Sequence, residues 1–379
     1  MAEGVGYGTR GDFAVLIGTR PEAIKLMPVV HALEEAGARP WVFLTGQHNE
    51  MLQPWLGEFG LEADEKLEVM ELDQSLAGLS ARLLTGLQEL LRRHRPRILI
   101  VQGDTTSVAV AALVGFYDNV RIAHVEAGLR TFSRRSPFPE EMNRRLVACL
   151  ADFHFAPTPR ARENLMAEGV QPSAIHLVGN TVIDALFYAR NRLVHRLRPE
   201  EPLAAILASE RRIVLVTAHR RESFGEDLRS IAEGIRRLAQ TFPEVAIVYP
   251  VHLNPNVEGL MRKSLAGLPN VYLLEPLSYP RFVQVLLRAG LVLTDSGGVQ
   301  EEATALGIPL LVARRTSERL EAVEAGVAEL VGPDAERIVE AATRLLTDEM
   351  AYARRAVPSP VFGDGRAARR IAEILIGRL

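Results

Sequence analysis

The chain has 379 residues, enough for two or three domains of about 150 residues each. Its 47% hydrophobic and 24% charged residues exclude a disordered, collagen-like or coiled-coil protein. Its 44 basic and 47 acidic side chains, a formal net charge of −3, exclude a generally basic nucleic-acid-binding protein. A single cysteine, Cys149, cannot form a disulfide framework or a cysteine-rich zinc site within one chain, which fits a reducing compartment. The chain starts without a secretory-signal pattern and no apolar run approaches about 18 residues, so we expect no membrane span.

In the first half of the chain, short apolar runs alternate with amphipathic stretches. Residues 13–17 predict a buried strand, and residues 22–36 have helical periodicity despite Pro28. The pattern continues with strands at 41–45, 98–101 and 122–125 and helices at 75–94 and 106–117. This alternation predicts a parallel sheet covered by helices on both faces.

The same pattern restarts after a charged stretch, residues 191–201. The strands expected there are 213–217, 246–251, 271–274, 291–294 and 310–312. We therefore expect an α/β chain with a boundary near residues 190–205, which divides it into two Rossmann-like, doubly wound domains, 1–190 and 200–363, that face each other across a cleft. In such sheets ligands bind beyond the carboxyl ends of the strands.

The motif Gly18-Thr19-Arg20-Pro21-Glu22 follows the first expected strand directly. Gly18 permits a tight turn and Pro21 suits the first position of a helix. Free backbone N–H groups at the helix start, together with Arg20 and Lys25, could hold a phosphate. The alternative is a plain strand-to-helix turn with surface charges.

The second half carries a matching motif, Thr294-Asp295-Ser296-Gly297-Gly298-Val299-Gln300-Glu301-Glu302. Gly297 and Gly298 let backbone amides approach an anion closely, and Ser296 adds a donor. Glu302 lies one helical turn further on, where a carboxylate can accept hydrogen bonds from a ribose diol. This string favours nucleotide binding over purely conformational glycines.

Acidic residues cluster between residues 103 and 145. Asp104 follows a strand, where a helix-capping role is the simple alternative. Glu126 also stands at the end of a strand, and Glu140 opens an expected helix. Glu140 and Arg144 are four residues apart and share a helix face, so they could equally form a surface salt bridge.

Two histidines end expected strands of the second domain. His219 is followed by two arginines, and His252 stands in Tyr-Pro-Val-His-Leu-Asn-Pro. Two histidines at strand ends of one domain, both facing the expected cleft, favour a functional role over a structural one.

Nine motifs in this order make the chain resemble the bacterial non-hydrolysing UDP-N-acetylglucosamine 2-epimerases. They are GTRPEAIK, TGQH, GDTTS, HVEAGLRT, PFPEEMNRR, VGNTVIDA, TAHRRESFG, YPVHLNPNV and TDSGGVQEEA. The resemblance extends from about Gly18 to Gly332. It implies a fold like that of the two-domain GT-B glycosyltransferases, and a C-terminal helix, residues 364–379, that packs back onto the first domain.

The resemblance also assigns residues to roles. The positions that match catalytic residues of the family are Asp104, Glu126, Glu140, Arg144 and His219. Those that match contacts to the nucleotide sugar are Arg20, Lys25, His252, Phe282, Ser296, Gly297, Gly298, Glu302 and Arg319. Which acid removes the C2 proton and which returns it stays open.

The implied reaction inverts C2 of the sugar between UDP-GlcNAc and UDP-ManNAc. The C2 proton is not next to a carbonyl, so the family breaks the anomeric C–O bond, releases UDP and passes through 2-acetamidoglucal. Two faces of C2 call for two proton-handling groups, and departing UDP needs positive charge and donors. No metal or redox cofactor is required, and nucleic acid and membrane are not expected partners. The resemblance implies a cytoplasmic homodimer.

Some family members have a second UDP-GlcNAc site that activates the enzyme. Residues that match it are Gln47, His48, Gln74 and Arg220. Glu50 and Asp73 are acidic where such members have Gln and Arg, and acids beside a diphosphate are repulsive, which argues against activation here. Two alternatives to the 2-epimerase reading are an epimerase for a related UDP-diacetamido sugar and a GT-B glycosyltransferase.

Overall fold

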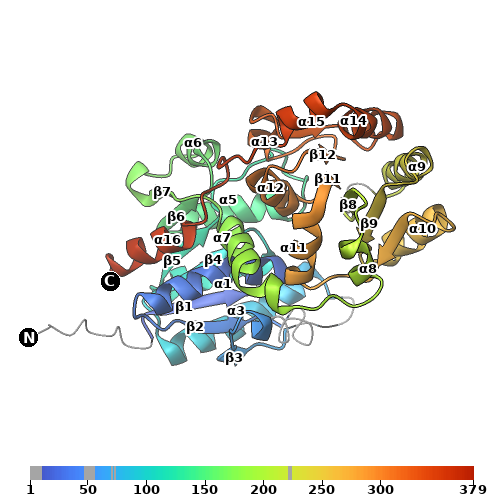
Figure 1. Cartoon of the computed structure of the whole chain (residues 1–379). Coiled ribbons are helices and arrows are strands. Elements are labelled where there is room, and N and C mark those ends of the chain that lie inside the picture. The colour runs from blue at the N-terminus through green and yellow to red at the C-terminus, as the bar shows by residue number, and fades with distance from the viewer. Residues whose placement is uncertain (1–10, 47–55, 70, 72–73, 221–223) are drawn as a thin grey trace, which may run out of the picture. The chain divides into compact units, whose positions relative to one another are not determined.

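The computed structural model describes residues 11–46, 56–69, 71, 74–220 and 224–379. The chain divides into two compact units (Figure 1), Met1–Ala185 with Gly363–Leu379, and Leu186–Phe362. The chain therefore enters the second unit a few residues ahead of the charged stretch that marked the expected boundary. The reason is that residues 189–196 continue α7 (Thr181–Tyr188) in helical form and pack on α11 (Tyr279–Arg288) of the second unit.

The first unit is built on a seven-stranded sheet in the order β3-β2-β1-β4-β5-β6-β7, in which every pair is parallel. Its strands are β1 (Phe13–Ile17), β2 (Trp41–Leu44), β3 (Glu65–Lys66), β4 (Ile98–Gln102), β5 (Arg121–Val125), β6 (Phe153–Ala156) and β7 (Ile175–Leu177). The strands β1 and β4 are buried along their whole length, as expected for inner strands covered on both faces.

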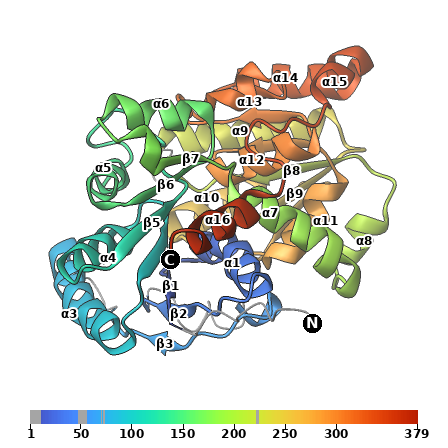
Figure 2. The ribbon, with the colours of Figure 1, turned by 90° about the vertical axis from the view of Figure 1, so that its left-hand side faces the viewer.

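Helices cover both faces of this sheet (Figure 2). One face carries α3 (Leu76–His94), α4 (Thr106–Tyr117) and α5 (Glu140–Leu150), which pack against one another in that order. The other carries α1 (Arg20–Glu35), α7 and α16 (Ala367–Ile376), and α16 packs on α1. The C-terminal helix thus belongs to the first unit, although the whole second unit precedes it in the chain. Helix α6 (Pro159–Ala167) also belongs to this unit.

The second unit contains a six-stranded parallel sheet in the order β10-β9-β8-β11-β12-β13. Its strands are β8 (Ile213–Thr217), β9 (Ala246–Pro250), β10 (Val271–Leu274), β11 (Ala289–Thr294), β12 (Leu310–Val312) and β13 (Ala328–Leu330). Its helices, besides α11, are α8 (Leu203–Ala208), α9 (Glu226–Thr241), α10 (Pro255–Leu265), α12 (Gly297–Leu306), α13 (Leu320–Glu324), α14 (Ala335–Thr347) and α15 (Glu349–Arg355). Both α10 and α14 pack on α9, and these helices bury their apolar faces against the sheet.

The expected α/β class with two Rossmann-like sheets is confirmed, and so is every strand predicted above. Four strands were not predicted, namely β3, β6, β7 and β13. Each has only two to four residues and includes a charged residue or a histidine, so none presents an apolar run. Among the described residues, no helix is long and apolar enough to cross a membrane.

Candidate active site

Three loops at the carboxyl edge of the first sheet carry the predicted chemistry. They follow β1, β4 and β5, which are neighbours in the sheet. Because neighbouring parallel strands end at the same edge, residues far apart in the sequence meet there. The His124 ring nitrogen Nε2 lies 2.8 Å from the carbonyl oxygen of Gly103, which ties the end of β5 to the loop after β4.

Glu126 is held by donors from three other segments. Its carboxylate oxygens lie 2.7 and 2.6 Å from Nζ of Lys25, on α1. The side-chain amide of Gln102 donates to Oε2, and that of Asn180 donates to Oε1 at 2.8 Å. Glu126 is 8% exposed, and its φ of 63° is uncommon for a residue with a side chain. A strained, buried carboxylate with this many donors is typical of a functional site.

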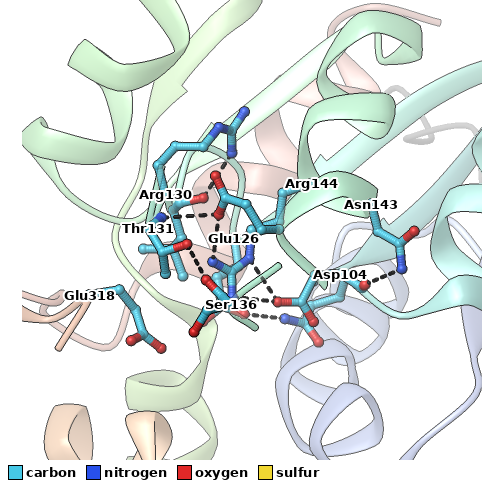
Figure 3. Close-up of polar contacts among 12 residues, drawn as sticks. Asp104, Glu126, Arg130, Thr131, Ser136, Asn143, Arg144 and Glu318 are labelled. Atoms are coloured by element: carbon cyan, nitrogen blue, oxygen red, sulfur yellow. Dashed lines mark hydrogen bonds and ion pairs between the residues drawn. The ribbon is translucent and has the colours of Figure 1, made fainter. Parts of the chain in front are cut away.

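Asp104 forms an ion pair and does not cap a helix. Its Oδ2 accepts from both Nε and Nη2 of Arg144 at 2.8 Å, and its carbonyl accepts from the Asn143 amide at 2.9 Å (Figure 3). The residue that caps α4 is Thr105, whose hydroxyl accepts from the Val108 N–H. The alternative role of Asp104 as a helix cap is therefore wrong.

Glu140 and Arg144 do not form the pair that their spacing suggested. Arg144 reaches Asp104 and, at 3.4 Å, Glu141 instead. Atom Oε2 of Glu140 is buried and has no hydrogen-bond partner among the described residues. A buried oxygen of this kind is rare in native proteins and calls for an explanation, such as a ligand that supplies the partner.

Glu141 is the fully buried neighbour of Glu140. It accepts the backbone N–H groups of Thr131 and Phe132 at 3.0 and 3.2 Å, and it pairs with Arg144. This carboxylate therefore links the loop before α5 to the Asp104–Arg144 pair. The loop is further closed by Thr131, whose hydroxyl donates to the carbonyl of Ser136 (Figure 3).

The loop after β1 differs from the expected phosphate cradle. The N–H groups of Gly18 and Thr19 both donate to the carboxylate of Glu22, at 2.6 and 3.3 Å, so they are already satisfied within the chain. Lys25 is engaged with Glu126. Burial lowers the pKa of Arg20 to about 10, which leaves it charged at neutral pH. The two N–H groups are therefore not free donors, and the role of Arg20 as a phosphate contact stays a prediction.

In the second unit, Asp295 joins the ends of two neighbouring strands. Its Oδ2 accepts the backbone N–H groups of His219 and Arg220, which follow β8, at 2.7 and 2.8 Å. Asp295 itself follows β11 and is fully buried. The His219 and His252 rings stack, with centroids 5.2 Å apart and an angle of 7° between planes. Sequence spacing predicted two histidines at strand ends, and the structure brings them into contact.

Helix α12 begins at the Ser296–Gly298 turn, which contains the first backbone N–H groups of the helix. Apart from its chain neighbours and its own helix backbone, no atom of the described residues lies within 4 Å of the position that a Cβ on Gly298 would occupy, so this side of the turn is open among them. Behind Gly297, the corresponding position would lie 2.8 Å from the guanidinium carbon of Arg319. Arg319 pairs with Glu301 at 2.9 Å and with Glu318, and is 5% exposed. Arg319 therefore supports the glycine turn through buried ion pairs.

Two predicted nucleoside contacts also lie in this unit. Glu302, on α12, is buried and its Oε1 accepts from the Tyr279 hydroxyl at 2.6 Å. Phe282 is half-buried on α11, the helix that Tyr279 begins. Neither role is tested by the structure, and both stay predictions.

Of the residues matched to an activating site, Gln47 and His48 lie outside the described residues. Gln74 accepts from Arg82 and from the backbone N–H of Glu71. Arg220 lies 3.9 Å from Glu318. The expected absence of substrate activation stays a prediction. The described part of the chain contains no cluster of three His, Cys, Asp or Glu side chains suited to a metal ion.

Sequence reasoning missed residues that act through others. Five polar residues each form a hydrogen bond to a predicted site residue or to its loop, namely Gln102, Asn180, Glu141, Asp295 and Glu22. All five are buried, and four of them stand inside the motifs quoted above. The available signal was a polar residue beside a strand end, which by itself does not distinguish a supporting residue from a solvated one.

Comparisons with known proteins agree on one family. The family model described as UDP-N-acetylglucosamine 2-epimerase matches residues 31–376. A UDP-N-acetylglucosamine 2-epimerase of Yersinia pestis is 46% identical over 364 residues, which cover 95% of this chain and 97% of that protein. The crystal structure of the UDP-GlcNAc 2-epimerase of Neisseria meningitidis, bound to UDP-GlcNAc, is 38% identical with a TM-score of 0.90 and covers 96% of this chain and 99% of that one. The glycotransferase of kitacinnamycin, at 14% identity and a TM-score of 0.67 over 98% of this chain and 100% of that one, shares the fold alone.

Proposed function

Because the chain belongs to the UDP-N-acetylglucosamine 2-epimerase family, we propose that it interconverts UDP-GlcNAc and UDP-ManNAc by inverting C2 of the sugar, without hydrolysis. The observation that carries this proposal is the pair of carboxylates at one edge of the first sheet, Asp104 and Glu126, together with Glu140 at the start of α5, the helix whose Asn143 and Arg144 contact Asp104. Binding of a nucleotide sugar without catalysis does not require the positive φ of Glu126 or the buried Oε2 of Glu140 that has no hydrogen-bond partner among the described residues.

The reaction proceeds by elimination and addition. The C1–O bond breaks, its electron pair leaves with UDP, and the C2 proton passes to a base, which gives 2-acetamidoglucal. A proton then adds to the opposite face of C2 and UDP returns to C1. The two proton carriers are Glu140, whose Oε2 lacks a partner, and Asp104, whose carboxylate is more accessible to solvent than Glu126.

Glu126 has a different part in this proposal. Its carboxylate already accepts hydrogen bonds from Lys25, Gln102 and Asn180, an arrangement that favours the charged form. A fixed anion of this kind stabilises the positive charge that develops at C1 as UDP leaves. In the second unit, the N–H groups of Gly297 and Gly298, with His219 and His252, are suited to receive the phosphates of UDP.

The test is NMR of UDP-GlcNAc with the purified protein in D2O. The proposal expects UDP-ManNAc with deuterium at C2. Free UDP with ManNAc would instead indicate a hydrolysing enzyme, and an unchanged substrate until an acceptor is added would indicate a glycosyltransferase. A UDP-diacetamido sugar that turns over faster than UDP-GlcNAc would change the substrate and leave the reaction class as it is.

We also propose a cytoplasmic homodimer. Phe116 and Tyr117 at the end of α4 are 60% and 59% exposed, and Leu146 on the neighbouring α5 is 52% exposed. Large apolar side chains on adjacent helices favour a subunit contact. Light scattering during size exclusion should give twice the chain mass, and the pair Phe116→Glu and Leu146→Glu should give the single mass. Cell fractionation tests the compartment.

A further inference from the structure

The side-chain amide of Asn180 forms hydrogen bonds with two different segments of the first unit. Its Nδ2 donates to Oε1 of Glu126 at 2.8 Å, and its Oδ1 accepts from the backbone N–H of Val182 at 3.1 Å, in the first turn of α7. Asn180 is 1% exposed. The residue therefore caps a helix with its oxygen and holds the predicted catalytic carboxylate with its nitrogen.

The backbone around Asn180 is fixed from the other side by the C-terminal segment. A Cβ on Gly363 would lie 3.2 Å from the backbone nitrogen of Asn180, so this segment packs directly against the backbone of Asn180. One turn further along α7, Asp184 accepts the N–H groups of Ala367 and Ala368 at 3.2 and 2.9 Å. The Asn180 amide thus has little freedom to follow a displaced Glu126.

Lys25, Gln102 and Asn180, the donors described above, are not equivalent in how they hold Glu126. Lys25 lies within 2.7 Å of both carboxylate oxygens, and an ammonium is a compact charge that binds a carboxylate in many rotational states. The two amides act on one oxygen each, Gln102 on Oε2 and Asn180 on Oε1. Two directed donors, one on each oxygen, define the plane of the carboxylate, which Lys25 alone does not.

We propose that Asn180 is a positioning residue of the epimerase, which fixes the plane of the Glu126 carboxylate so that it faces C1 of the sugar as UDP leaves. The proposal rests on the function proposed above. It assigns Asn180 no contact with substrate, and it distinguishes this side chain from a helix cap that only stabilises α7.

The substitution Asn180→Asp separates the two tasks. The new side chain has the same shape and can still accept the Val182 N–H, but it has no N–H to donate and places a second carboxyl about 2.8 Å from Glu126. At low pH one proton can be shared between the two carboxyls, as in other close carboxyl pairs. As the pH rises the proton is lost and the two carboxylates repel each other.

Other ionisable groups on the surrounding elements already have partners. Lys25 on α1 is bound to Glu126 itself, and Asp104 after β4 to Arg144. Asp184 on α7 accepts from α16, and burial raises its pKa to about 6. Burial also raises the pKa of Glu22 on α1 to about 7, so both carboxyls titrate in this range in the unsubstituted protein as well. On β5, burial lowers the pKa of His124 to about 4, so this ring stays neutral in the range of interest. A titration that appears only in the Asn180→Asp variant is therefore that of the new pair.

The assay measures kcat and KM for UDP-GlcNAc between pH 5.5 and pH 9 in both proteins. We expect kcat of Asn180→Asp to be close to normal at the acid end and to fall about 10- to 100-fold as the pH rises, by analogy with residues that orient the ligands of a metal ion. KM should change little, because Asn180 does not touch substrate. Asn164→Asp is the matched control, since Asn164 also donates within the first unit, to the Gly128 carbonyl at 2.9 Å, an acceptor that is not a carboxylate. Its pH profile should parallel that of the unsubstituted protein.

A pH profile of Asn180→Asp that parallels the unsubstituted protein would overturn the proposal and leave Asn180 as a helix cap. Infrared difference spectroscopy supplies a readout without turnover, since the proposal expects a protonated carboxyl band in Asn180→Asp well above the pH at which Asp ordinarily ionises. If the unsubstituted protein does not invert C2 of UDP-GlcNAc, that result refutes the proposed function, whatever the behaviour of the Asn180→Asp variant. The absence of the carboxyl band would overturn the contact between Asn180 and Glu126 independently of activity.

Discussion

The buried pair Lys25–Glu126 allows a double-mutant cycle whose magnitude follows from its geometry. The two charges approach to 2.6 Å, with side chains only 10% and 6% exposed. At an effective dielectric of about 20, their attraction is about 6 kcal/mol, and desolvation of both groups offsets much of it. Removing one partner alone leaves a buried charge without compensation, which typically costs about 3–5 kcal/mol.

The perturbation is Lys25→Met, which keeps most of the volume of the stem and removes the charge. We expect it to destabilise the first unit by about 3–5 kcal/mol. In the double variant Lys25→Met with Glu126→Gln, most of this loss should be recovered, because no buried charge is then left. The coupling energy between the two positions should therefore be about 2 kcal/mol or more.

The assay is hydrogen exchange of peptides from β4 and β5, which reports the unfolding of the first unit without assuming that both units unfold together. Peptides from β8 and β9 serve as the internal control and should not change. A coupling energy below about 0.5 kcal/mol would refute the reasoning, since the pair would then be screened like an exposed one.

Three further predictions concern single residues. Asp104→Asn should slow C2 deuterium exchange about 10²- to 10⁴-fold while leaving UDP affinity nearly unchanged in calorimetry, and loss of UDP binding would make this acid structural. Burial lowers the pKa of His124 and of His154 to about 4, below the ordinary value of about 6.5, so the unfolded chain binds protons that the folded chain does not. Stability from these rings is complete above about pH 6.5 and is lost as the pH falls toward 4, by up to about 3 kcal/mol each, so denaturation of His124→Gln should depend less on pH in this window. Asp184→Ala should speed hydrogen exchange in α16, whose first N–H groups it accepts, and unchanged exchange there would show that packing on α1 suffices.

The strands and the positions of the polar motifs were predictable because they depend on local patterns. An apolar run such as 98–101 is recognised from the order of residues alone and predicts a buried strand. Polar residues that directly follow such a strand lie at the carboxyl edge of a parallel sheet. The edge strands β3 and β7 were not predictable, because strand pairing and not side-chain pattern makes them strands.

The partners of the site residues were less predictable. Glu140 and Arg144 have the spacing of an i, i+4 pair, yet Arg144 turns to Asp104, 40 positions away along the chain. Glu22 occupies the N–H groups that seemed free for a phosphate. In both cases a contact made by the fold outcompetes the one suggested by spacing, and one-dimensional patterns hold no information about it.

The first unit is not continuous in the sequence, and this affects the order in which it can fold during synthesis. Residues Met1–Ala185 leave the ribosome first, but α16 follows only after all of Leu186–Phe362 has been made. At about 5–20 residues per second, the 194 residues from Leu186 to Leu379 take roughly 10–40 s. For that time α1 lacks the helix that packs on it, and Asp184 lacks the two N–H groups that it later accepts. The second unit is continuous and can fold as it emerges, so the half of the molecule that is translated first is the last to be completed.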